Sequence, residues 1–459
     1  MKIAFVSGNR ETLPDAVVPI GLLYIMSSVP AGHEKKLIDL CFADDPISDL
    51  CGALTEFQPD LIALSMRNIQ NADYSNISDN LDYYAALIGA AKSVSRAPIV
   101  IGGAGFSVMP SQLMGRLGAD YGISGEGEEA FPALLRALEA TARQDAELAL
   151  IGGLHWYRNG RLVANSRGPA FLDLNRLPAP DRSPVDPRYY ALCGIESVQT
   201  TRGCPLRCDY CTYPLIEGRI GRVREPAKIV DEMFQAVEQH PNISHFFIVD
   251  SVFNLPRTHA KNVCRELVRR GWAIPWTCYA NPLGFDREFA ELAVAAGCAG
   301  MEIGSDSGID AVLQRLNKGF TTRHIRQLHE LCVDTGLRDC HTFILGTKGE
   351  TLDDVKQTIE FAIGLDPFAA IMMIWVDDLE TMDLELQQQR MALRQQIAEL
   401  LLGYRHDMKH WCVPSLGVNY SGDFFAQLRR IGLEGPLWQH VRGPLKPASR
   451  SRAPQSITG

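Results

Sequence analysis

The sequence lacks a long hydrophobic run, because no uncharged apolar stretch approaches the roughly 20 residues that cross a membrane. It also lacks a basic surplus. The formal net charge is −9, whereas a nucleic-acid-binding face needs clustered positive charge. Residues 1–6 lead directly into a predicted strand instead of a signal peptide. These absences predict a soluble cytoplasmic protein without a membrane or nucleic-acid partner, whose twelve cysteines stay reduced.

No compositional extreme points to a fibrous or disordered chain. Hydrophobic residues make up 46% and charged residues 22% of the sequence, as in ordinary globular proteins. The chain of 459 residues is too long for one compact core, so we expect two or three domains.

A local absence is more informative: three cysteines share one short loop that contains no fourth ligand. Cys204, Cys208 and Cys211 are separated by three and then two residues, and Gly203 and Pro205 bend the backbone between them. Iron–sulfur clusters held by protein alone take four thiolates, so this loop predicts a [4Fe–4S] cluster with one open iron. The alternatives are a zinc site, which usually has four protein ligands, and three unrelated core cysteines.

The loop resembles the CxxxCxxC signature of the radical S-adenosylmethionine (SAM) enzymes. The preceding Arg202-Gly203 and the aromatic Tyr210 before the last cysteine also match that family. The resemblance implies that SAM chelates the open iron and is cleaved by an electron from the cluster, in most members to a 5′-deoxyadenosyl radical. It also implies an external flavodoxin- or ferredoxin-like electron donor.

Residues 1–145 alternate short apolar runs with helical stretches. The expected strands are residues 2–7, 36–40, 61–65, 99–103 and 120–123. This alternation is typical of a Rossmann-like (flavodoxin-like) parallel sheet, whose ligands lie beyond the carboxyl ends of its strands. Glycine-rich or polar segments follow three strands and supply the candidate ligand contacts: Arg67, Gly102, Gly103, Gly105, Ser107, Gly125, Glu126 and Gly127. By composition alone, nucleotide binding and purely structural turns fit equally well.

In this order, Pro-x-Gly-Leu, Gly-Gly-x-Gly-Phe-Ser and Gly-Glu-Gly-Glu resemble the cobalamin-binding domain fused ahead of many radical SAM proteins. The Asp-x-His-x-x-Gly motif that gives cobalt a histidine ligand is missing, so the resemblance implies cobalt without histidine ligation. Arg67 is our candidate for the lower side of the corrin. The alternative is a phosphate-binding or surface arginine.

Residues 146–194 are expected to form a connector that contains a hairpin over 154–162. Between residues 195 and 376, strand and helix alternate six times, which is too few for a closed eight-stranded barrel and resembles the partial (β/α)6 barrel of radical SAM enzymes. Residues 377–442 are expected to form a mostly helical cap, and residues 443–459 a disordered tail.

Candidate SAM contacts follow the strands of this partial barrel. Asp250 and Asn254 stand where the resemblance would place the amino group of SAM, although Asp250 could instead cap a loop. Asp306 occupies the position of the ribose-binding acid in the family's Gly-x-Glu-Ser-Gly pattern. Its shorter side chain suggests that Glu302 or Ser305 shares this task.

Two further contacts come from resemblance to downstream segments. Lys318 matches the Asn-Lys-Gly lysine that pairs with the SAM carboxylate, or is solvated. Gly346 belongs to a segment that resembles Ile-Gly-x-Pro-Gly-Glu-Thr, with Lys348 in place of the proline. The family's segment backs the adenine, and the alternative is an ordinary helix start. Tyr279, His341 and Trp375 are weaker substrate-pocket candidates.

The resemblance implies a cobalamin-dependent radical SAM methyltransferase acting on a small organic substrate. SAM would methylate reduced cobalamin, and the substrate would take the methyl group from cobalt in methylcobalamin. The alternatives are a non-methylating rearrangement, cyclisation or oxidation with both cofactors, a radical SAM enzyme without cobalamin, and a non-catalytic cluster protein.

Overall fold

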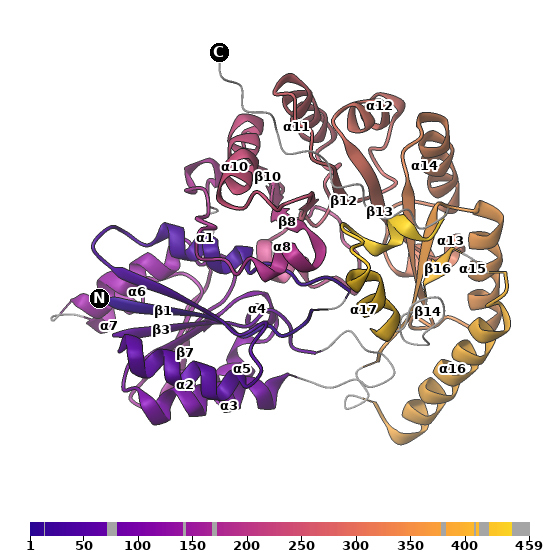
Figure 1. Cartoon of the computed structure of the whole chain (residues 1–459). Helices are drawn as coiled ribbons and strands as arrows, with labels where there is room; N and C mark the ends of the chain where they lie inside the picture. Colours follow the sequence, from indigo (N-terminus) through magenta and orange to yellow (C-terminus); the bar gives the residue numbers. More distant parts are fainter. Residues whose placement is uncertain are drawn as a thin grey trace, which may run out of the picture.

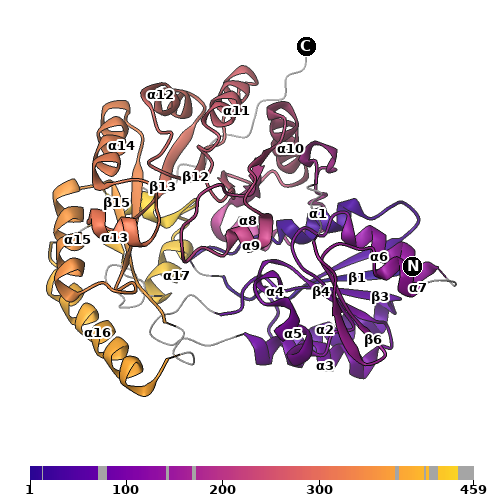
Figure 2. The same ribbon diagram turned by 180° about the vertical axis from the view of Figure 1, so that it is seen from behind.

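The chain folds into two α/β lobes, as Figures 1 and 2 show from opposite sides. A computed structural model describes residues 1–12, 14–70, 80–140, 144–167, 172–377, 382–407, 410–412 and 422–442. The expected tail, residues 443–459, lies outside this range. The first lobe, here the N lobe, comprises residues 1–167, and the second, here the barrel lobe, comprises residues 195–377. Both sheets are built mainly of parallel strands, which confirms the predicted α/β class.

The N lobe contains a seven-stranded sheet in the order β2-β1-β3-β4-β5-β6-β7. The first five strands are parallel: β1 (Lys2–Ser7), β2 (Glu34–Asp39), β3 (Leu61–Ser65), β4 (Ile99–Gly102) and β5 (Tyr121–Ile123). The antiparallel hairpin β6 (Leu154–Arg158) and β7 (Arg161–Ala164) pairs with β5. The hairpin that we expected within a connector therefore extends this sheet.

Helices cover both faces of the N-lobe sheet, which explains why its central strands are continuous apolar runs. They are α1 (Ile20–Ser28), α2 (Pro46–Phe57), α3 (Leu81–Val94), α4 (Ala104–Val108), α5 (Pro110–Leu117), α6 (Ala130–Glu139) and α7 (Gln144–Leu148). Helices α2, α3 and α5 form one hydrophobic core with the sheet, and α1 and α6 contribute to the other. Helix α4 was not predicted, because its sequence reads as a glycine-rich loop.

The barrel lobe contains a curved parallel sheet in the order β16-β15-β14-β13-β12-β11-β8. Its strands are β8 (Ile195–Val198), β11 (His245–Ile248), β12 (Trp276–Ala280), β13 (Cys298–Asp306), β14 (Asp339–Leu345), β15 (Ala369–Ile374) and β16 (Trp411–Cys412). The six expected strands are present. The seventh, β16, comes from the C-terminal region and is too short to be read from the sequence.

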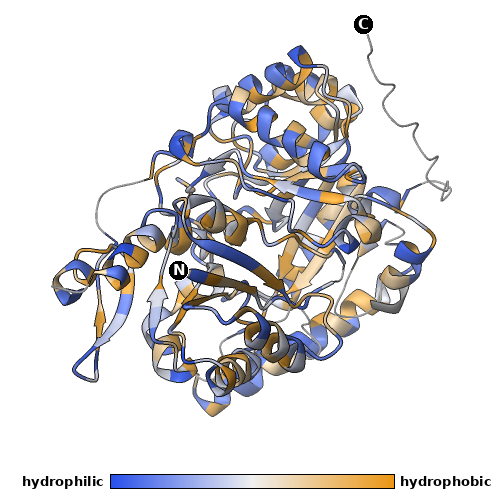
Figure 3. Ribbon diagram, turned by 60° about the vertical axis from the view of Figure 1, so that its left-hand side comes forward, coloured by the Kyte–Doolittle hydropathy of each residue, from blue (hydrophilic) through white to orange (hydrophobic). Residues whose placement is uncertain are grey.

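Six helices form an arc on the outside of this sheet (Figure 1). They are α10 (Pro226–Gln239), α11 (Arg257–Arg269), α12 (Arg287–Ala295), α13 (Asp310–Arg315), α14 (Thr322–Thr335) and α15 (Leu352–Leu365). Figure 3 shows them banded blue and orange, while most barrel strands are orange. In β13 and β15, fully buried residues alternate with half-buried ones, because successive side chains point to opposite faces of the sheet. The half-buried residues are therefore those of the concave inner face.

Shorter elements join and cover the two lobes. They are η1 (Leu174–Arg176), α8 (Arg188–Cys193), β9 (Thr201–Arg202), α9 (Tyr213–Glu217), β10 (Arg222–Val223), α16 (Leu384–Gly403), α17 (Gly422–Arg430) and η4 (Leu437–His440). Helix α17 lies between the lobes in both views. Among the residues that the structure describes, no helix is both long and apolar enough to span a membrane.

Candidate functional site

A cavity of about 700 Å³ lies between the two lobes. On one side it is lined by the carboxyl ends of β1, β3, β4 and β5, and on the other by the concave face of the barrel sheet. Seven predicted contacts line it: Arg67, Gly102, Gly103, Gly125, Glu126, Gly127 and Glu302. The carboxyl edge of a parallel sheet is the expected place for a ligand. Here it opens directly onto the barrel.

Ser107 and Gly105 shape this cavity from behind. The Ser107 hydroxyl donates to the Gly103 carbonyl at 2.8 Å and accepts the Gly125 amide at 2.9 Å, which ties together the loops after β4 and β5. A Cβ on Gly105 would lie 3.2 Å from the Arg67 backbone, so glycine permits this close approach. These two predicted contacts therefore support the cavity wall.

Arg67 follows β3, and its exposed side chain lines the cavity. Its guanidinium makes no ion pair or hydrogen bond with any other residue that the structure describes. A cation that is unpaired within the described residues is compatible with the predicted role facing a corrin ring, which stays a prediction.

The three predicted cluster ligands share the segment between β9 and α9, here the cysteine loop (residues 203–212). Cys204 is buried, Cys208 and Cys211 are half-buried, and all three are free thiols. Burial raises the pKa of Cys208, and the nearby Lys318 ammonium opposes this shift. Metal binding requires thiolates, so a cluster would take up the ionised form of these thiols. Three unpaired thiols on one loop fit a [4Fe–4S] cluster with one iron open for another ligand.

Gly203 determines how the cysteine loop begins. It has φ +84°, and a Cβ there would lie 2.2 Å from the Ile220 carbonyl. Its amide donates to Glu217 at 3.1 Å. Only glycine fits this turn.

Asp250 has a different contact from the predicted one with the SAM amino group. Its buried carboxylate accepts the backbone amides of Thr200 at 2.6 Å and Thr201 at 3.0 Å, together with the Thr200 hydroxyl. Burial raises the pKa of Asp250 to about 6, against these hydrogen bonds. It braces the backbone that leads into the cysteine loop, which is the alternative we had left open.

Asn254 also has an internal contact. Its side-chain amide donates to the carbonyls of Asn281 at 2.8 Å and Leu283 at 3.0 Å, and its oxygen accepts the Asn281 amide at 2.9 Å. Asn254 therefore joins the loops after β11 and β12, and its amide is occupied within the protein.

Asp306 and Lys318, predicted separately, lie together next to the cysteine loop. The Lys318 ammonium is 2.7 Å from an Asp306 oxygen, and both side chains are almost fully buried. Tyr210 of the loop donates to the same carboxylate at 2.5 Å and accepts from Lys318 at 3.1 Å. The Trp375 ring packs edge-on against Tyr210, with centroids 5.9 Å apart. This group places a cation and an anion beside the cysteine loop.

Glu302 and Ser305 face different environments. Glu302 lines the cavity and accepts a hydrogen bond from the indole of Trp438 at 2.9 Å. Ser305 is fully buried and lies 2.7 Å from Nδ1 of His341. Glu302 is thus open to a ligand, whereas Ser305 belongs to the interior of the barrel.

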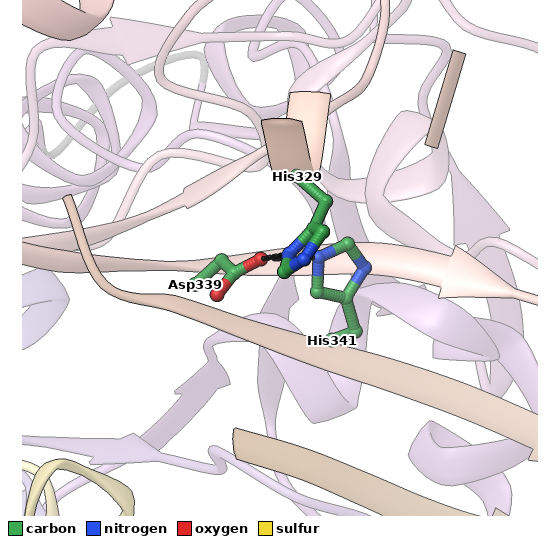
Figure 4. A group of neighbouring side chains, drawn as sticks. All are labelled: His329, Asp339 and His341. Atoms are coloured by element: carbon green, nitrogen blue, oxygen red, sulfur yellow. Dashed lines mark hydrogen bonds and ion pairs between the residues drawn. The ribbon is translucent and has the colours of Figure 1, made fainter. Parts of the chain in front are cut away.

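His341, a predicted pocket residue, belongs to a buried polar group with His329 and Asp339, shown in Figure 4. Nδ1 of His329 and Nε2 of His341 lie 2.6 Å and 3.0 Å from the same Asp339 oxygen. Both nitrogens lie at hydrogen-bonding distance from one carboxylate oxygen, which is the geometry of a hydrogen-bonded network. The group therefore supports β13 and β14, and His341 does not reach the cavity.

Gly346 follows β14 with φ +80°. Its amide donates to Glu350 at 2.9 Å, and its carbonyl accepts from Arg390 of α16. The backbone predicted to back the adenine is therefore held in place by the C-terminal helix.

A charged network that we did not predict from the sequence joins the lobes. The N-lobe residues Glu126 and Glu128 pair with Arg202, next to the cysteine loop, at 3.1 and 2.5 Å. Deeper in the interface, Glu232 of α10 pairs with Arg182 at 2.8 Å and Arg224 at 2.6 Å. Glu126 was a predicted cofactor contact; its carboxylate also positions the cysteine loop. The Gly-Glu-Gly-Glu and Arg202-Gly203 motifs contain three members of this network, but neither motif shows that they pair.

Comparisons with known proteins agree with this arrangement. The B12 binding domain model matches residues 7–135, and the Radical SAM superfamily model matches residues 198–362. Tryptophan 2-C-methyltransferase of Streptomyces laurentii is 29% identical, covering 79% of this chain and 70% of that protein. An uncharacterized methyltransferase of Pyrococcus horikoshii is 27% identical, covering 80% and 78%.

A solved structure has the same fold. The radical SAM methyltransferase TsrM of Kitasatospora setae, with cobalamin and a [4Fe–4S] cluster bound, superimposes with a TM-score of 0.72. It is 27% identical and covers 81% of this chain and 74% of its own. These findings confirm the predicted resemblance and the cofactor set of [4Fe–4S] cluster, SAM and cobalamin. The chain therefore belongs to the cobalamin-dependent radical SAM enzymes.

Proposed function

We propose that the protein is a methyltransferase that moves a methyl group from SAM to a small organic molecule with the help of cobalamin. The observation that carries this function is the single cavity that joins the glycine-rich strand ends of the N lobe to the concave face of the barrel. When bound, cobalamin supplies methyl-transfer chemistry and the cluster supplies a binding site for SAM. The protein's own task is to hold three reactants in line.

Each lobe would bind one cofactor. Cys204, Cys208 and Cys211 would hold the cluster. Lys318 would pair with the SAM carboxylate and Asp306 with the ribose, in exchange for their present ion pair of 2.7 Å. Charge-assisted hydrogen bonds of this kind are strong and directional.

On the opposite wall, Arg67 and the loops after β4 and β5 would face the corrin. The contacts of Arg202 with Glu126 and Glu128 fix the cysteine loop relative to these loops. These ion pairs hold the barrel and the N lobe together at the proposed reaction site. We also propose a flavodoxin- or ferredoxin-like protein as the external electron donor.

Labelled SAM tests this function directly. Protein reconstituted without oxygen should retain corrin absorbance through gel filtration and transfer the labelled methyl group to an added substrate, such as tryptophan. Cys208→Ala should lose SAM turnover, because two thiolates are too few to hold the cluster. SAM turnover that persists in this variant would contradict the catalytic assignment, and loss of the corrin on the column would contradict the cobalamin site.

A further inference from the structure

The barrel half of the cavity has aromatic walls. The rings of Phe247 on β11 and Tyr279 on β12 meet edge to face, with centroids 5.0 Å apart. Trp438 of η4 closes the same side. All three belong to the cavity lining, and flat aromatic walls favour a planar aromatic ligand.

Glu302 is the acid at the centre of these walls. Tyr279 and Glu302 are directly paired in the register of β12 and β13, so their side chains lie side by side on the concave face. The indole of Trp438 donates to one Glu302 oxygen at 2.9 Å. No lysine or arginine pairs with this carboxylate within the part of the chain that the structure describes.

Other acids of the cavity lining are already neutralised or hydrogen-bonded. Asp15 pairs with Arg429, and both Glu126 and Glu128 pair with Arg202. Glu217 accepts hydrogen bonds from the Gly203 amide and from Gln199. Among these acids, Glu302 therefore has the carboxylate that can accept a hydrogen bond from a ligand.

Burying the Glu302 carboxylate without a cationic partner is unfavourable in free energy. Burial raises its pKa to about 7, and the bond from Trp438 opposes this shift only in part. An acid desolvated without a cation gains most from a partner that brings positive charge or an N–H donor. A ligand can supply this missing partner.

We propose that Glu302 is the substrate-binding carboxylate, and that the substrate is a small aromatic molecule carrying a protonated amine. This inference rests on the proposed function, because it places the substrate in the barrel half of the same cavity. The ring would lie against Phe247, Tyr279 and Trp438, and the ammonium group would donate to Glu302.

Two probes with the same ring separate the effect of charge from that of shape. Tryptamine is a cation and indole-3-propionate is an anion at neutral pH. We expect the holoenzyme to bind tryptamine at least about tenfold more tightly than indole-3-propionate in equilibrium dialysis, the scale of a hydrogen bond to a charged group. Glu302→Gln should abolish this preference, and Glu302→Asp should retain part of it. Cooperative melting at a temperature no lower than that of the wild type would show that the variants are folded.

Three results would overturn the inference: equal binding of the two probes, an unchanged preference in Glu302→Gln, or a loss of SAM binding in that variant. The last result would assign Glu302 to SAM. The dialysis does not depend on turnover. A Glu302-dependent preference without any methyl transfer would therefore contradict only the proposed function, and methyl transfer without the preference would contradict only this inference.

Discussion

At the scale of one residue, Glu302 makes stability depend on pH. Its folded pKa of about 7 exceeds that of an unfolded glutamate, which is about 4.3. Between these values the folded protein binds more protons than the unfolded chain, so this carboxyl lowers the free energy of unfolding as pH rises. The difference in melting temperature between Glu302→Gln and the wild type should therefore increase in favour of the variant as the pH is raised from 5 to 8. Calorimetry without ligand measures this difference.

The comparison of the two proteins across pH removes the effects of groups that they share. The facing groups, Tyr279 and the paired Asp15, are unchanged in the variant. Melting curves that stay parallel from pH 5 to pH 8 would show that Glu302 titrates normally.

At the scale of an element, the end of β13 is held by β14. The register between these strands shifts between Gly304 and Asp306, and Asp306 has φ +59°, which is uncommon for a residue other than glycine. Ser305, at this bulge, is anchored by His341, which is anchored in turn by Asp339. The polar group of Figure 4 therefore directs Asp306 toward Lys318.

Replacing His341 should disturb this bulge. His341→Phe leaves Ser305 and Asp339 with fewer partners in a buried place, so we expect a loss of about 1–3 kcal/mol in urea unfolding. Because Asp306 would be released, SAM binding in equilibrium dialysis should weaken as well. His324→Ala on the neighbouring α14 is the control, since His324 only caps that helix. A destabilised variant with full SAM affinity would show that the bulge does not position Asp306.

At the scale of the whole molecule, a buried network fastens the N lobe to the barrel. Glu232 pairs with Arg182 and Arg224, and Tyr24 of α1 donates to the same carboxylate at 3.0 Å. Glu232→Gln would leave the buried Arg224 without its counter-charge and Arg182 with Glu196 alone, 3.2 Å away, and breaking a buried pair in this way costs about 3–5 kcal/mol. We expect earlier urea unfolding and faster loss of corrin on gel filtration.

Tyr24→Phe is the matched control for this network, because it removes one hydroxyl from the interface and leaves both ion pairs intact. Its effect should be about 1–2 kcal/mol, because the hydroxyl donates to Glu232 and accepts from Arg224. If Glu232→Gln were no more destabilised than Tyr24→Phe, the ion pairs would not fasten the lobes.

Much of the fold follows from local sequence. The expected strands of the N lobe appear at nearly the predicted residues, and the barrel lobe shows the predicted alternation of strand and helix, because apolar runs and helical periodicity are local properties. Helix α4 was missed because Gly102, Gly103 and Gly105 look like a loop. The place of the β6–β7 hairpin was missed because its pairing with β5 is set by distant residues.

The candidate site was predicted less completely. The positions of Asp250 and Asn254 after β11 suggested a ligand contact, but the sequence cannot show where a side chain points. Thr200 lies 50 residues from Asp250, and Asn281 lies 27 residues from Asn254. These partners turn both side chains into the protein.

The sequence by itself determined the cysteine loop and the order of strands and helices, because both depend on local patterns, and the resemblance of its motifs to a known family implied the cofactor set. Only the tertiary structure decided which charged groups are free to bind a ligand. Glu126 meets Arg202 across 76 residues, and Glu302 meets Trp438 across 136. A carboxylate becomes a binding group when folding leaves it without a cation, and the choice of partner is made between distant segments of the chain.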